Sequence, residues 1–130
     1  MVAVKSFMIP REKFVTVERD MNVQTAARIM RDRGIGSQFV TNGKEIIGIL
    51  TDTDMVRRVV AAGADTQKTT VEQVMSAPLL AIDENKSLLD ANDLMAKTHI
   101  RHLGVTQDGK LVGLISVRDL VLFLTNLPRK

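Results

Sequence analysis

The sequence predicts a mixed α/β (α+β) fold in which two β-α-β-β-α repeats pack together with pseudo-two-fold symmetry. The first observation is an internal repeat: residues after Met21 match residues after Asn85, without a gap, at a spacing of 65, as Ala26 does with Ala91 and Asp54 with Asp119. The second is an Asn-Gly pair at 42–43 and an Asp-Gly pair at 108–109, each between apolar runs, which is a strong hairpin signal. Because a unit of about 60 residues is marginal alone, we expect the two copies to share a core.

The first repeat contains each element of this pattern in order. A short apolar strand is expected at Phe14–Val17 and a helix at Val23–Arg33, where apolar residues recur at helical spacing and Gly34 provides a stop. The hairpin follows, and a second helix at Thr53–Ala62 closes the repeat. A polar linker at Ala64–Thr70 leads to the second copy.

The second repeat gives the same order of elements. We expect a strand at Leu79–Ile82, a helix at Ser87–Thr98, a hairpin, and a closing helix at Val117–Thr125 that is apolar nearly all round. Upstream of these elements the register slips by two residues, since Met8 corresponds to Met75. The predicted domains are residues 1–66 and 67–130.

Composition excludes several classes of protein. There are no cysteines, so disulfides, zinc-thiolate sites and thiol catalysis are ruled out. The net charge is only +3, spread along the chain, with four Phe and no Trp or Tyr, which argues against a nucleic-acid partner. No apolar run has the length of a membrane span, and the N-terminus lacks the features of a signal peptide. We therefore expect a cytoplasmic protein with no membrane partner.

No pattern in the sequence indicates an enzyme or a metal site. A nucleophile elbow, a P-loop lysine and a convincing acid–base pair are all absent from the sequence. The two histidines, His99 and His102, are expected to be a helix C-terminal cation and a strand-edge residue. Three arginines are expected on a solvated face, with contact to a phosphate as the alternative: Arg57, Arg58 and Arg118. We expect no catalytic residues, no catalytic cofactor and no metal.

One motif occurs at matching positions of both repeats. The chain contains G-I-L-T-D-T-D at Gly48–Asp54 and G-L-I-S-V-R-D at Gly113–Asp119, each at a junction between strand and helix. A helix N-terminus and a hydroxyl suit a phosphate, and a carboxylate three residues later can accept both hydroxyls of a ribose. The alternative is structural, since the same residues also fit an N-cap with an acidic residue in the first turn.

The repeat pattern, the hairpin and the G-h-h-T/S-x-x-D ending of both copies resemble the cystathionine-β-synthase-type (CBS) domain family, over nearly the whole chain. The resemblance implies a tandem pair, a Bateman module, that binds adenosine ligands (AMP, ADP or ATP) in two clefts and often dimerises. It assigns phosphate and ribose to Thr51 and Asp54, and to Ser116 and Asp119. The family usually has an apolar residue where Gln38 stands, and Pro in place of Gly104.

The resemblance also implies which further residues line the two clefts, because the family builds each cleft crosswise from both repeats. The Asp54 cleft would then include Ile49, Ala77, Ile100, Arg101 and His102. The Asp119 cleft would include Leu114, Ile9, Thr16, Ile35, Gly36 and Ser37. Only the first set contains two cationic side chains, so we expect the clefts to differ in affinity for phosphate.

The resulting hypothesis is a regulatory module that senses the level of an adenine nucleotide, with AMP as the first choice of ligand. It would act through an effector protein that the sequence does not identify, and as a homodimer. Two alternatives stay open at this point. One is a protein-interaction or dimerisation scaffold with vestigial sites, and the other is a binder of S-adenosylmethionine or a dinucleotide.

Overall fold

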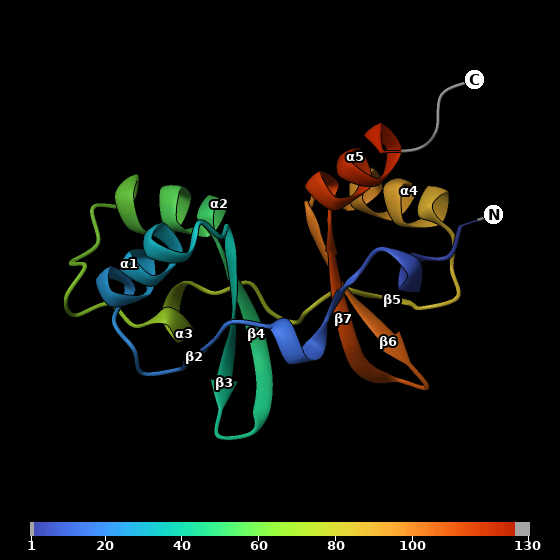
Figure 1. Cartoon of the computed structure of the whole chain (residues 1–130). Coiled ribbons are helices and arrows are strands. Elements are labelled where there is room, and N and C mark those ends of the chain that lie inside the picture. Colours follow the sequence, from blue (N-terminus) through green and yellow to red (C-terminus); the bar gives the residue numbers. More distant parts are fainter. Residues whose placement is uncertain (1, 127–130) are drawn as a thin grey trace. The chain divides into compact units, whose positions relative to one another are not determined.

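A computed structural model describes residues 2–126, which form two compact units (Figure 1). The middle unit is Phe14–Leu79, and the terminal unit combines Met1–Lys13 with Leu80–Lys130. Both contain helices and one sheet, so the predicted mixed fold is confirmed. The two units are defined by which parts of the chain pack together, whereas the predicted domains 1–66 and 67–130 are defined by the sequence repeat. The domain bounds therefore stay a prediction. Residues 1 and 127–130 lie outside the described range.

The middle unit is built on a three-stranded sheet in the order β2-β3-β4. The strands are β2 (Thr16–Glu18), β3 (Ser37–Asn42) and β4 (Glu45–Thr51), with β2 parallel to β3 and β3 antiparallel to β4. Its helical segments are α1 (Val23–Arg33), α2 (Asp52–Asp54), the π-helical η3 (Met55–Val60) and α3 (Val71–Val74). Strand β2 begins two residues later than the sequence predicted.

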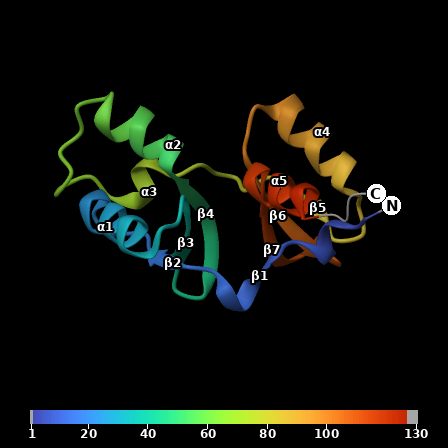
Figure 2. The same ribbon diagram turned by 45° about the horizontal axis from the view of Figure 1, so that its top comes forward.

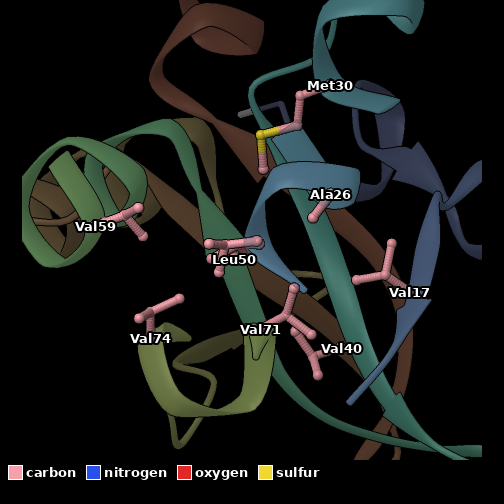
Figure 3. Close-up of a cluster of buried hydrophobic side chains, with 9 residues drawn as sticks. Val17, Ala26, Met30, Val40, Leu50, Val59, Val71 and Val74 are labelled. Atoms are coloured by element: carbon pink, nitrogen blue, oxygen red, sulfur yellow. The ribbon is translucent and has the colours of Figure 1, made fainter. Parts of the chain in front are cut away.

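The core of the middle unit lies between this sheet and its helical segments. Figure 3 shows side chains from β2, β3, β4, α1, η3 and α3 around one common interior. The buried members of this core are Val17, Val23, Ala26, Met30, Val40, Leu50, Val59, Val71 and Val74. Two of them belong to α3, so the four-residue helix that follows the polar linker is part of the core.

The terminal unit has a four-stranded sheet in the order β1-β7-β6-β5. Its strands are β1 (Ile9–Pro10), β5 (Ala81–Asp83), β6 (His102–Gln107) and β7 (Lys110–Ser116). Its helices are α4 (Leu88–Thr98), α5 (Val117–Thr125) and the short 3-10 turns η1 (Val4–Ser6) and η2 (Arg11–Lys13). The buried core consists of Val4, Ile82, Ala91, Met95, Leu103, Val105, Ile115 and Leu120.

The short segment that precedes each repeat packs into the unit formed by the other repeat. Near the N-terminus, Val4 is fully buried in the terminal core, and Ile9 of β1 pairs with Leu114 of β7. Figure 2 shows β1 beside β7. After the linker, α3 packs into the middle core and Ser76 pairs with Ile49 in β4. The segment before the first repeat thus belongs to the terminal unit, and the segment before the second repeat belongs to the middle unit. We call this arrangement the exchange of entering segments.

Two glycines allow these entering segments to approach the sheets. A Cβ on Gly48 would lie 2.9 Å from the carbonyl oxygen of Ser76, and one on Gly113 would lie 3.0 Å from that of Ile9. The sulfurs of Met75 and Met8 pack against the same two glycines. The predicted correspondence of Met8 with Met75 is thus confirmed by equivalent contacts.

The two hairpins repeat one another in detail. Each has an irregularity in its ladder at the same place, after Val40 in one copy and after Val105 in the other. The turn at 108–109 is as predicted, but the first turn is 43–44 rather than 42–43, because Asn42 still pairs with Glu45 as part of the ladder. Both turns begin with a residue of positive φ.

The helix predicted at Thr53–Ala62 differs from a regular α-helix. It begins one residue earlier, as α2, and continues as the π-helical η3, in which the amide of Ala61 donates to the carbonyl of Val56 at 2.8 Å. No helix within residues 2–126 is long and apolar enough to cross a membrane.

Candidate ligand-binding site

The first copy of the motif lies where β4 ends and α2 begins. Thr51 is the N-cap of α2, and its Oγ1 accepts a hydrogen bond from the backbone N–H of Asp54 at 3.2 Å. In return, Asp54 Oδ2 accepts bonds from the backbone N–H of Thr51 at 3.0 Å and from its hydroxyl at 3.1 Å. The pair forms a complete capping box.

The second copy has the same arrangement where β7 meets α5. Ser116 Oγ accepts from the backbone N–H of Asp119 at 3.2 Å, and Asp119 Oδ2 accepts from the N–H and hydroxyl of Ser116 at 2.8 and 2.9 Å. Both motifs are therefore helix caps, as the structural alternative predicted. The cap uses Oδ2 of each carboxylate. The other oxygen, Oδ1, is therefore the one whose neighbours determine whether the carboxylate can bind a ligand.

The Oδ1 atom of Asp54 has two further neighbours within the middle unit. The hydroxyl of Ser76 donates to it at 2.9 Å, and Nε of Arg58 lies 3.9 Å away. Arg58 Nη1 also donates to the carbonyl of Met75 at 2.9 Å. Asp54 is only 6% exposed, so these donors replace water around a buried carboxylate.

Sequence reasoning missed Ser76 and assigned Arg58 to a solvated face. The Arg58 side chain is half exposed, yet it contacts both Asp54 and the segment that carries Ser76. The contact between Ser76 and Asp54 spans 22 residues and depends on the packing of α3 and the ladder bond to β4. The sequence signal that could have found it is the hydroxyl residue directly after Met75, at a position where the other copy has Ile9.

The middle unit holds six other predicted site residues. Ile49 pairs with Ser76, and Ala77 is the exposed residue that follows. Ser37 lies opposite Thr51 in the β3–β4 ladder, and the carbonyl of Gly36 accepts from the amide of Asp52 at 3.0 Å. Two residues lie elsewhere in this unit: Thr16 is exposed on β2 opposite Phe39, and Ile35 packs against the core.

The terminal unit holds the remaining residues. Ile9 pairs with Leu114 in the ladder between β1 and β7. His102 lies opposite Ser116, and the carbonyl of Arg101 accepts from the amide of Val117 at 3.0 Å, so both neighbour the Asp119 motif within this unit. Ile100 is half-buried against the terminal core. The crosswise combinations, which join residues of both units, stay a prediction.

Within residues 2–126 there is no group of three or more His, Cys, Asp or Glu side chains placed to hold a metal ion. Asp54 accepts hydrogen bonds from Thr51 and Ser76 with Arg58 nearby, and Asp119 accepts them from the amide and hydroxyl of Ser116. Such carboxylates suit hydrogen-bond donors of a ligand.

Comparison with known proteins places the chain in a family. The sequence pattern of the CBS domain matches it twice, over residues 4–61 and 71–126. The CBS domain-containing protein YhcV of Bacillus subtilis is 37% identical over 107 residues, which covers 82% of this chain and 76% of YhcV. An uncharacterized conserved protein from Pyrococcus horikoshii has a similar structure, with a TM-score of 0.87 at 27% identity over 99% of this chain and 96% of that one. CBSX2, solved in complex with AMP, has the same fold, with a TM-score of 0.78 at 22% identity over 99% and 100% of the two chains.

Proposed function

Because the chain belongs to the CBS domain family and contains two copies of that domain, we propose that it is a regulatory Bateman module that binds an adenosine ligand, with AMP as the first candidate. Ligand occupancy would report the level of a nucleotide to an effector protein. The proposal assigns the binding of ribose to the carboxylates of Asp54 and Asp119. It assigns no catalytic step to the chain.

The observation that carries the proposal is the repeated carboxylate at the start of a helix. In both units an Asp is held by its own cap through Oδ2, so its position is set before any ligand arrives. The two vicinal hydroxyls of a ribose can donate to such a carboxylate, and charge-assisted bonds of this kind are stronger than neutral ones. The complex of CBSX2 with AMP supports the choice of ligand, because that protein has the same fold.

A second candidate function is dimerisation, and the surface of α5 favours it. Val117, Val121, Leu122 and Leu124 are 39–53% exposed, although α5 also contributes Leu120 to the terminal core. Apolar helix surfaces of this kind are commonly covered by another chain. We propose a homodimer of about 29 kDa, twice the 14.4 kDa chain, which light scattering would detect as a mass above that of the monomer.

Thermal unfolding with a panel of ligands tests the binding proposal. The panel contains AMP, ADP, ATP, adenosine, S-adenosylmethionine and a dinucleotide, with guanosine monophosphate as the control for the base. A ligand present at 100 times its Kd stabilises the folded protein by about 2.7 kcal/mol, which is a shift of several degrees. We expect AMP to give such a shift. A panel without any shift would leave the dimerisation scaffold as the function.

A further inference from the structure

We propose that Ser76 closes the Asp54 site, and that its hydroxyl must leave the carboxylate before a ribose can bind. The inference rests on the proposed function, in which Asp54 accepts the hydroxyls of an adenosine ligand. It concerns the neighbours of Asp54 Oδ1, which are Ser76 and Arg58.

Two hydroxyl groups of the protein already occupy the two oxygens of Asp54. Thr51 donates to Oδ2 at 3.1 Å, and Ser76 donates to Oδ1 at 2.9 Å. Oδ2 already accepts two bonds from Thr51, so a hydroxyl of the ribose has to approach Oδ1, where Ser76 is already a donor. The ligand therefore competes with Ser76 for Oδ1.

Arg58 holds the segment that carries Ser76 beside the carboxylate. Its Nη1 donates to the carbonyl of Met75 at 2.9 Å, while its Nε lies 3.9 Å from Asp54 Oδ1. The guanidinium thus links the end of α3 to the start of η3. Because the negative charge of the buried carboxylate is balanced within the unit, the closed state is stable without a ligand.

The hydroxyl of Ser76 can leave without any movement of the backbone. The amide of Ser76 donates to the carbonyl of Ile49 at 2.8 Å, and its carbonyl accepts from the amide of Ile49 at 3.0 Å. These two bonds fix the main chain, so opening requires only rotation of the side chain to another rotamer. Opening then costs about one hydrogen bond to a charged group, which corresponds to roughly a tenfold loss of affinity.

At the Asp119 motif, the residue equivalent to Ser76 is Ile9. Ile9 pairs with Leu114 as Ser76 pairs with Ile49, and the repeat spacing of 65 relates Ile49 to Leu114. Their partners Ser76 and Ile9 are therefore equivalent. Isoleucine has no hydroxyl to donate. The same spacing places Phe123 at the position of Arg58, and Phe123 stacks against Phe7 with ring centroids 5.2 Å apart.

Calorimetric titration of AMP tests the proposal in a chain whose other motif is disabled by Asp119→Asn. In this background we expect Ser76→Ala to raise the affinity for AMP about tenfold, because nothing then competes for Oδ1. Ser76→Thr retains a hydroxyl and should bind within about twofold of its parent. An unchanged or weakened affinity in Ser76→Ala would overturn the proposal.

The mirror experiment uses the background Asp54→Asn, in which only the Asp119 motif keeps its carboxylate. Ile9→Ser places a hydroxyl at the equivalent position and should lower the affinity for AMP about tenfold. Ser76→Ala is the matched control and should leave this affinity unchanged. An effect of Ser76→Ala here would mean that the substitution acts through the whole fold, and would contradict the proposal.

A measurement without ligand separates this proposal from the proposed function. A double-mutant cycle between Ser76→Ala and Asp54→Asn, read by urea unfolding, should show that the two substitutions are coupled. If neither the wild type nor Ser76→Ala binds AMP while the coupling is present, the proposed function fails and the competition with ribose fails with it, although the closure is real. Absence of coupling would overturn the closure itself.

Discussion

Gln38 lies at the centre of β3, in a position that is 1% exposed. Its Nε2 donates to the carbonyl of Ala26 at 3.0 Å, but its Oε1 has no hydrogen-bond partner among the described residues. An unpaired buried oxygen is destabilising, because it has lost its contact with water without compensation. The other copy has the fully buried Leu103 at the matching position.

We therefore predict that Gln38→Leu stabilises the protein by about 1 kcal/mol, after the loss of the bond to Ala26 is deducted. Urea unfolding would measure the change. The matched control is Leu103→Gln, which places a polar group in the apolar core of the terminal unit and should destabilise the protein by about 2 kcal/mol. A Gln38→Leu protein less stable than the wild type would indicate that a water or another group satisfies Oε1.

At the level of single elements, the exchange of entering segments has a direct consequence. Val4 is fully buried in the terminal core, and the amides of Val4 and Lys5 donate to carbonyls of Lys86 and Glu84 at 2.8 and 3.1 Å. The first ten residues therefore stabilise the second half of the chain. None of residues 2–10 belongs to the buried cluster of the middle unit.

We predict that Val4→Ala destabilises the terminal unit by about 2 kcal/mol, through the cavity and the lost apolar contacts. Hydrogen exchange would show faster exchange in α4, β6 and β7, with little change in α1 and β3. Val71→Ala is the matched control, since Val71 is fully buried in the middle core and should give the opposite distribution. Faster exchange in α1 after Val4→Ala would contradict the exchanged arrangement.

The elements also show what could be predicted from sequence. Helix α1 was predicted to the residue, because Gly34 ends it in a left-handed conformation that most residues avoid. Strand β1 and helix α3 carry no such signal: they span two and four residues, too short for any periodicity, and their packing partners come from the other repeat. The same difference between local and long-range contacts explains which parts of the site could be predicted. The caps at Thr51 and Ser116 are local and were predicted, whereas the bond from Ser76 is tertiary and was not.

For the whole molecule, the repeat gives two related motifs whose surroundings differ. The capping boxes are the same in both units, but Asp54 has a serine and an arginine at Oδ1, where the equivalent residues of the other copy are Ile9 and Phe123. A module with two such sites would fill them at different concentrations of one ligand. That difference would widen the range of nucleotide levels to which it responds.

Titration of AMP into the wild type, Asp54→Asn and Asp119→Asn tests the central claim that these two carboxylates bind the ligand. Each substitution preserves size but removes the charge that receives the ribose hydroxyls, so each should weaken one of two binding events by about 1–3 kcal/mol, or roughly 5- to 150-fold. The midpoint of urea unfolding confirms that the variants are folded. If both variants are folded and titrate like the wild type, Asp54 and Asp119 are helix caps only, and the account of the site is wrong.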